Sequence, residues 1–124
     1  MDSAEELRER TKQFSLRIIR LFRQIPWQND AHVIAKQLLR SGTSIGANYR
    51  AACRARSRNE FIAKLCIVVE EADETVYWLE LLSESELVPR DKLAGLLREA
   101  KELAAIFTAS KATMTEDLPA PNMR

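Results

Sequence analysis

The side chains best suited to chemistry in this sequence are cations in the middle of the chain. At about 100° per residue, several arginines fall opposite the apolar stripe of a helix expected over residues 30–55. Guanidinium groups can hold phosphate through two hydrogen bonds, so these residues form a candidate RNA or DNA interface. The group comprises Arg40, Arg50, Arg54, Arg56, Arg58 and Lys64. No named nucleic-acid motif and no interleaved aromatic residue accompanies it, so a solvated face or a subunit contact is the alternative.

The charge of the chain is unevenly distributed along its length. Residues 1–60 hold 12 Lys and Arg against 6 Asp and Glu, whereas residues 61–124 hold 7 against 12. Glu70 and Glu74 lie together on the outer face of the next expected helix, near Glu71 and Asp73. A basic stripe on one subunit could therefore pair with an acidic stripe on another, which would set register and partner choice.

Residues for catalysis or metal binding are sparse. Helical di-iron sites use Glu-x-x-His pairs, but His32 is the only histidine and position 29, three residues before it, is Asn. We expect His32 to be a surface or helix-start residue and predict no metal site and no cofactor. The candidate nucleophiles lack a paired histidine on any readable motif, and we predict that the protein is not an enzyme. They are Ser41, Ser44, Cys53 and Cys66.

The composition indicates one soluble helical domain. The 124 residues are 46% hydrophobic and 30% charged, with only three Gly and four Pro. The N-terminus is charged and polar, unlike a signal peptide, and no apolar run reaches the roughly 18 residues that a membrane helix needs. We therefore expect a cytoplasmic protein with no membrane partner and with both cysteines reduced.

Helix-start and helix-stop residues divide the chain into four parts. Ser3 to Glu6 and Ser57 to Glu60 are capping boxes, Asn29 or Asp30 can cap a second helix, and Pro26 and Pro89 mark a helix end and a helix start. The predicted helices cover residues 4–25, 30–55, 58–83 and 89–112, followed by a frayed tail over 113–124. Each has an apolar stripe, so residues 1–124 are predicted to form an all-α, antiparallel up-and-down four-helix bundle.

Small and polar residues interrupt the stripe of the second predicted helix. Gly42 and Gly46 lie four apart on one face and would let another backbone approach closely, at a cost of roughly 1 kcal/mol each in helix propensity. Ser41 and Asn48 add polar groups there, and a buried Asn usually fixes the register of packed helices.

Further apolar residues lie off the core stripes and predict an oligomer, because contiguous exposed apolar surface usually marks a protein interface. Together with the acidic residues of the third helix they define the predicted subunit interface. Its members are Ile19, Phe22, Ile67, Glu70, Glu74, Trp78 and Leu81.

A family resemblance is concentrated in the two central helices. Its motifs are RSGTSIGAN over residues 40–48, Ser57 with Glu60-Phe61, Glu71-Ala72, Glu74-Thr75 and Tyr77-Trp78-Leu79. On these residues the chain resembles the four-helix-bundle proteins first recognised as products of intervening sequences inside bacterial 23S rRNA genes. The outer helices match by length and pattern only. The chain departs from many relatives at Tyr49-Arg50-Ala51-Ala52, where those have Ile-Ala-Glu-Gly, so no role of that Glu carries over.

The resemblance implies homopentameric rings of up-and-down bundles without an established enzyme activity. A related bundle is the accessory protein of diversity-generating retroelements, which binds nucleic acid and a reverse transcriptase. A reverse transcriptase or a ribosomal component is thus a possible partner, beside RNA, DNA and other copies of the chain. Our leading interpretation is a ring-forming adaptor that touches nucleic acid; the alternative is a pure protein-interaction module whose basic and acidic faces pair between subunits.

Overall fold

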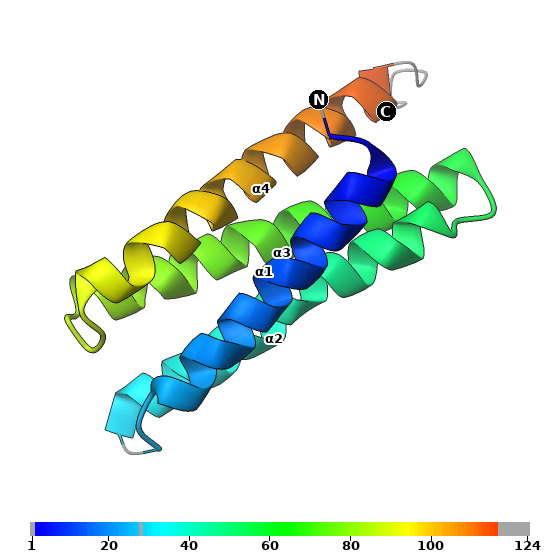
Figure 1. Cartoon of the computed structure of the whole chain (residues 1–124). Coiled ribbons are helices and arrows are strands. Elements are labelled where there is room, and N and C mark those ends of the chain that lie inside the picture. The colour runs from blue at the N-terminus through cyan, green and yellow to red at the C-terminus, as the bar shows by residue number, and fades with distance from the viewer. Residues whose placement is uncertain (1, 28, 117–124) are drawn as a thin grey trace, which may run out of the picture.

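The computed structural model describes residues 2–27 and 29–116, which form four α-helices and no strand (Figure 1). The helices are α1 (Ala4–Gln24), α2 (Asn29–Cys53), α3 (Arg58–Glu84) and α4 (Arg90–Glu116). Successive helices run in opposite directions, so the start of α1 and the last turns of α4 lie at the same end of the molecule (Figure 1). The predicted all-α class with four helices is confirmed, and the helix packing is compatible with a bundle.

The helix ends follow from local sequence. The hydroxyl oxygens of Ser3 and Ser57 accept hydrogen bonds from the backbone N–H groups of Glu6 and Glu60, each at 3.1 Å, as the two capping boxes predict. Ile25 has an extended backbone, because the following proline disfavours the helical region for it. These two effects set where α1 begins and ends and where α3 begins.

The observed bounds differ from the predicted ones mainly at the C-terminal end. α4 begins one residue after Pro89 and continues to Glu116, four residues beyond the predicted end at 112. Residues 113–116 are therefore helical rather than frayed, and the remainder of the predicted tail, 117–124, lies outside the described residues. The turn before α4 contains Glu86 at φ 61°, in the left-handed region.

The core is formed by the predicted stripes. The largest fully buried side chains include Phe14 and Ile18 of α1, Leu65 of α3 and Phe107 of α4. Tyr49 of α2 packs against Phe107 with ring centroids 4.9 Å apart, which links the second and fourth helices across the interior. Because all four helices contribute buried side chains to one cluster, residues on their outer faces are held on a rigid frame.

α1 and α2 approach closely at the two glycines. A Cβ at Gly42 would lie 3.0 Å from Ile18 Cγ1, and one at Gly46 would lie 3.2 Å from Thr11 Oγ1 and 3.4 Å from the Thr11 backbone carbon. The distances of 3.0 Å at Gly42 and 3.2 Å at Gly46 are shorter than ordinary Cβ contacts, so the predicted packing role of this glycine pair is confirmed. Asn48 behaves otherwise: its amide donates to the Ser44 carbonyl oxygen of its own helix at 2.9 Å and makes no bond that would set register.

α1 and α4 contact each other least among neighbouring helices, and an ion pair joins them. Arg10 donates through Nε and Nη2 to the two carboxylate oxygens of Glu99, each at 2.7 Å, and through Nη1 to Asp2 at 2.9 Å. The hydrogen bonds to Glu99, with the one to Asp2, raise the pKa of Arg10 above its ordinary value. The two parallel hydrogen bonds from Arg10 to the Glu99 carboxylate fix the geometry of the contact between α1 and α4.

Candidate nucleic-acid interface

A hollow of about 850 Å³ lies between α1 and α2 near the start of α1 and the end of α2. Gly46 and Ala47 of α2 are among its lining residues. Two rows of cations border it, one from α1 and one from α2, each with the i, i+4 spacing that places side chains on one helix face. The cationic lining residues are Arg8, Lys12, Arg50 and Arg54.

A second hollow of about 440 Å³ lies on the other side of Arg50 and Arg54, towards the start of α3. Arg56, from the α2–α3 turn, and Lys64 of α3 complete its cationic lining. The two hollows thus share Arg50 and Arg54, which stand between them. We call the six cations around both hollows the basic face: Arg8, Lys12, Arg50, Arg54, Arg56 and Lys64.

None of these six cationic groups forms a salt bridge with the described residues 2–27 and 29–116; every ion pair found there involves Arg10 or Arg40. Arg8, Arg50, Arg54 and Arg56 are exposed, while Lys64 is half-buried. Their charges are accordingly available to a ligand. Carboxylates are nearby, with Glu5 and Glu9 lining the first hollow and Glu60 the second.

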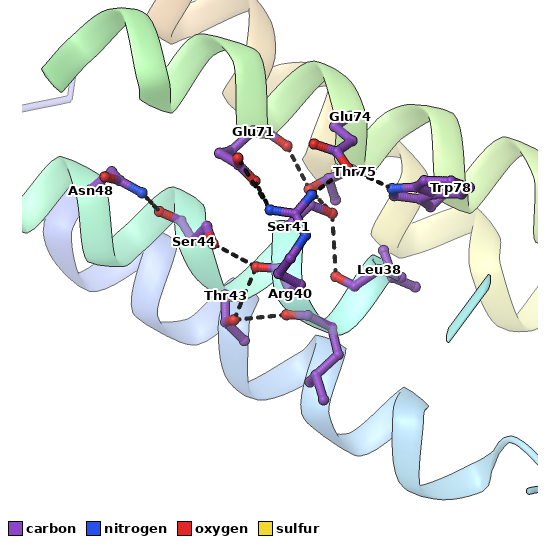
Figure 2. A network of polar contacts seen from close by, with 11 residues as sticks. Leu38, Arg40, Ser41, Thr43, Ser44, Asn48, Glu71, Glu74, Thr75 and Trp78 are labelled. Atoms are coloured by element: carbon purple, nitrogen blue, oxygen red, sulfur yellow. Dashed lines mark hydrogen bonds and ion pairs between the residues drawn. The ribbon is translucent and has the colours of Figure 1, made fainter. Parts of the chain in front are cut away.

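Arg40 lies outside the basic face, although helical periodicity predicted that it would belong to the candidate interface. Figure 2 shows its guanidinium directed at α3, where Nη1 donates to Glu71 Oε2 at 3.1 Å and Nη2 donates to Glu74. The hydrogen bond to Glu74, and secondarily those to Glu71, raises the pKa of Arg40. Arg40 therefore already has carboxylate partners within its own chain, and we leave it out of the proposed interface.

Glu74 is held from two directions. It accepts hydrogen bonds from Arg40 and from the indole nitrogen of Trp78, the latter at 3.1 Å (Figure 2). The Arg40 bond is the main reason that the pKa of Glu74 lies below its ordinary value, and the Trp78 bond adds to it. The pairing of basic and acidic stripes that we predicted between subunits thus occurs, for Arg40 and Glu74, between α2 and α3 of one chain.

A buried hydroxyl pair lies beside this ion pair. Thr75 and Ser41 are fully buried and joined at 3.0 Å between their side-chain oxygens, and Thr75 also donates to the Glu71 carbonyl oxygen at 2.7 Å (Figure 2). Unpaired buried hydroxyls are costly, so this contact favours one register of α2 against α3. Ser41 and Thr75 carry the register role that we had assigned to Asn48.

Arg58 is also engaged within the chain. It donates to the backbone carbonyl oxygen of Met114 at 2.9 Å and so connects the start of α3 to the last turns of α4. Of the six predicted phosphate-binding residues, the structure therefore brings Arg50, Arg54, Arg56 and Lys64 together, while Arg40 and Arg58 face other helices.

Comparison with known proteins assigns the chain to a family. The sequence profile of the family described as 23S rRNA-intervening sequence protein matches residues 5–109. The chain belongs to this family. The resemblance read from residues 40–82 is confirmed, and the match extends it to the outer helices.

A solved structure is similar to this family member over most of both chains. It is the 1.70 Å crystal structure of a protein with unknown function from the S23 ribosomal protein family of Bacteroides thetaiotaomicron VPI-5482. The two share 38% sequence identity with a TM-score of 0.78, and the match covers 84% of this chain and 96% of that chain. None of the curated proteins compared with the chain matches it.

In this 23S rRNA-intervening sequence family protein, the predicted subunit-interface residues differ in exposure. Glu70 is exposed and Ile67 is 37% exposed, so both are accessible on the outer face of α3. The other hydrophobic members are half-buried, and two of them, Phe22 and Trp78, pack against the core cluster. The remaining two are Ile19 and Leu81. The accessible part of the predicted interface is therefore smaller than the sequence suggested.

Sequence reasoning missed Arg8 and Lys12, which belong to the basic face. A signal was present, since these cations lie four residues apart on the first helix, away from its apolar stripe. It also missed three strongly exposed apolar side chains: Trp27 at 76%, Val33 at 64% and Tyr77 at 52%. Trp27 follows Pro26 in a turn, where no helical periodicity indicates which way a side chain points.

His32 lies at the start of α2, as expected, but it is buried rather than on the surface. Its ring stacks on Trp27 with centroids 4.2 Å apart, and its Nε2 has no hydrogen-bond partner among the described residues. Within residues 2–27 and 29–116, no group of three or more His, Cys, Asp or Glu could hold a metal ion. No described helix is long and apolar enough to cross a membrane.

Cys53 lines the first hollow, and Tyr49 lies four residues before it on α2. Tyr49 is buried, and burial, reinforced by the neighbouring Cys53, raises the pKa of Tyr49 to about 12. Its phenol therefore stays neutral at physiological pH. The chemistry that the described part of the site offers is thus electrostatic, because the accessible groups around the hollows are chiefly permanent cations.

Proposed function

We propose that this member of the 23S rRNA-intervening sequence protein family is a non-enzymatic, cytoplasmic adaptor that binds RNA or DNA through its basic face. The observation that carries the proposal is the grouping of six cations without salt bridges to the described residues around two adjoining hollows. Such a surface attracts a polyanion, and arginine in particular binds phosphate oxygens through two hydrogen bonds.

The proposal makes a quantitative statement about salt. Each cation that neutralises a phosphate releases counterions, and the logarithm of the affinity falls by about 0.7 to 0.9 per phosphate for each tenfold rise in salt. Six contacts give a slope of roughly −4 to −5, and the affinity falls by about three orders of magnitude between about 50 and 200 mM salt. Such binding carries little sequence preference, because phosphate contacts do not read bases.

The test is fluorescence anisotropy with nucleic-acid-stripped protein and a structured RNA across that salt range. An Arg50→Ala/Arg54→Ala variant should bind more weakly, with the slope reduced by about 1 to 2. A matched control, Arg20→Ala/Lys36→Ala, removes the same charge from exposed positions elsewhere on α1 and α2 and should retain the slope. Both variants must keep the native oligomer size. Absence of binding by the native protein at the lowest salt would refute the nucleic-acid role.

A second candidate function is a pure protein-interaction module. It is favoured by the outer face of α3, where Ile67, Glu70 and Tyr77 are exposed at successive spacings of three and seven residues and so share one helix face. Exposed apolar side chains beside acids suit an interface with a basic, partly apolar partner surface. A homo-oligomeric ring, a homopentamer as the family resemblance implies, would use this face for assembly and leave nucleic acid without a role.

Native mass spectrometry separates the two functions. Glu70→Arg should disrupt the oligomer if acidic and basic faces pair between subunits, and a compensating Arg50→Glu should restore it. Glu84→Arg, an exposed charge reversal at the end of α3, is the matched control and should leave the oligomer intact. An oligomer unaffected by Glu70→Arg would contradict this mode of assembly.

A further inference from the structure

We infer that the basic face takes double-helical nucleic acid, with Arg50 and Arg54 directed into a groove and the outer cations on its two phosphate backbones. The inference rests on the proposed function and specifies which form of nucleic acid the face accepts. It is carried by the arrangement of the cations around the two hollows and by the kinds of side chain that are missing between them.

The cations form a central ridge with a row on each side. Arg50 and Arg54 line both hollows, so they stand between them on the last turns of α2 and just beyond. The row on α1 borders only the first hollow, and the row from the α2–α3 turn and α3 borders only the second. The outer rows are Arg8 with Lys12, and Arg56 with Lys64.

The separation of the outer rows suits two backbones rather than one. α2 packs against both α1 and α3, and packed helices have axes about 8 to 10 Å apart, which puts the outer rows on the order of 10 to 20 Å from each other. The major groove of B-form DNA is about 12 Å wide between its backbones. A single strand follows one line and would engage the ridge with one of the outer rows.

The lining of the hollows lacks the residues that hold single strands. Proteins that bind single strands combine a basic groove with aromatic side chains on which bases stack, and no aromatic residue is among the described residues that line either hollow. Trp27 precedes the opposite end of α2, about 36 Å away along a helix of 25 residues. Tyr77 is about 20 Å along α3 from Lys64.

Electrostatics favours the duplex as well. Without stacking, affinity depends on counterion release, which is about 0.9 per phosphate for a duplex and about 0.7 for a single strand. For six contacts this difference corresponds to roughly tenfold tighter duplex binding near 0.1 M salt. The carboxylates in the hollows also fit a groove, because Glu5, Glu9 and Glu60 can accept hydrogen bonds from base amino groups or ribose 2′-hydroxyls.

The experiment compares an RNA duplex and a DNA duplex, each about 20 base pairs or two helical turns long, with their separated unstructured strands. Binding is measured by anisotropy over a salt series, using the full chain in its native oligomeric state. Two double variants each remove one outer row: Arg8→Ala/Lys12→Ala and Arg56→Ala/Lys64→Ala. Arg20→Ala/Lys36→Ala serves again as the charge-matched control, and circular dichroism verifies that every variant is folded.

We expect at least one duplex to bind about tenfold tighter than its own strands. Loss of either outer row should lower the slope for that duplex by about 2, and the control should not. The duplex that binds more tightly then identifies whether the basic face prefers double-helical RNA or double-helical DNA. The inference would be overturned if the single strands bound as tightly as both duplexes, or if removing one outer row left the salt slope unchanged. Either result would leave the proposed function intact. If no probe binds at about 50 mM salt, the proposed function itself fails.

Discussion

The close approach of α1 and α2 at Gly42 makes the sharpest stability prediction. A Cβ added at Gly42 would meet three carbon atoms of Ile18 at 3.0, 3.1 and 3.4 Å, and Ile18 is fully buried and cannot swing away. Gly42→Ala therefore has two opposing effects. It improves helix propensity, and it overfills the contact between the two helices.

The two effects can be given magnitudes. Replacing a mid-helix glycine by alanine stabilises a helix by about 1 kcal/mol, whereas overpacking a filled core costs about 1 to 3 kcal/mol. Gly42→Ala should therefore lower the free energy of unfolding by about 0 to 2 kcal/mol. Gly95 of α4 supplies the matched control, because a Cβ there would meet only the ends of flexible arginines, the nearest being Arg17 Nη2 at 3.2 Å. Gly95→Ala should show the stabilising effect of about 1 kcal/mol alone.

The measurement is urea unfolding followed by circular dichroism at a fixed protein concentration, since assembly shifts apparent stability. A second background isolates the cause. Ile18→Ala removes the three crowding carbons at a cost of about 2 to 5 kcal/mol, and on that background Gly42→Ala should become stabilising. The reasoning is refuted if Gly42→Ala stabilises the native protein as much as Gly95→Ala does, or if its effect is the same with Ile18 and with Ala at position 18.

Three further predictions concern the contacts between α2 and α3. Thr75→Val leaves the buried Ser41 hydroxyl with only its long hydrogen bond to the Leu38 carbonyl oxygen, at 3.4 Å, and should cost about 1 to 3 kcal/mol in urea unfolding; adding Ser41→Ala should cost less than the sum of the single changes. Arg40 and Trp78 lower the pKa of Glu74, so its stabilisation is present above the unfolded carboxyl value of about 4.3 and is lost as pH falls through the folded pKa. Glu74→Gln should flatten the loss of stability in acid, by no more than about 1 kcal/mol because the pair is partly exposed; an unchanged pH profile would contradict the pairing. Arg40→Ala should cost up to about 1 kcal/mol but leave the salt slope of RNA binding unchanged, whereas a slope lower by about 1 would place Arg40 on phosphate.

The fold could be predicted because its determinants are local or periodic. The apolar residues of each helix recur with the helical period, and Ser3, Ser57 and Pro26 mark helix ends through contacts within a few residues. The glycine spacing of α2 also predicted a close helix contact. Which side chain fills that contact could not be predicted, because it depends on how α1 lies across α2.

The candidate site could be predicted only in part, for the same physical reason. Helical periodicity places Arg40 and Arg50 on the outer side of one helix, but it does not show what the neighbouring helix presents there. Arg40 meets carboxylates 31 and 34 residues away in sequence, whereas Arg50 and Arg54 project between hollows that have no such pairing. The partnership depends on the register of α2 against α3, which the buried Ser41 and Thr75 pair helps to set.

The cations of this chain thus divide by what lies opposite them. Arg10, Arg40 and Arg58 each reach across to another helix and bind a carboxylate or a carbonyl oxygen there, so replacing one of them should change stability more than binding. The basic face has no salt-bridge partner among the described residues, so its replacement should change binding more than stability. The two sets of variants, measured by unfolding and by salt-dependent RNA binding, therefore test whether the unpaired charges serve an external partner.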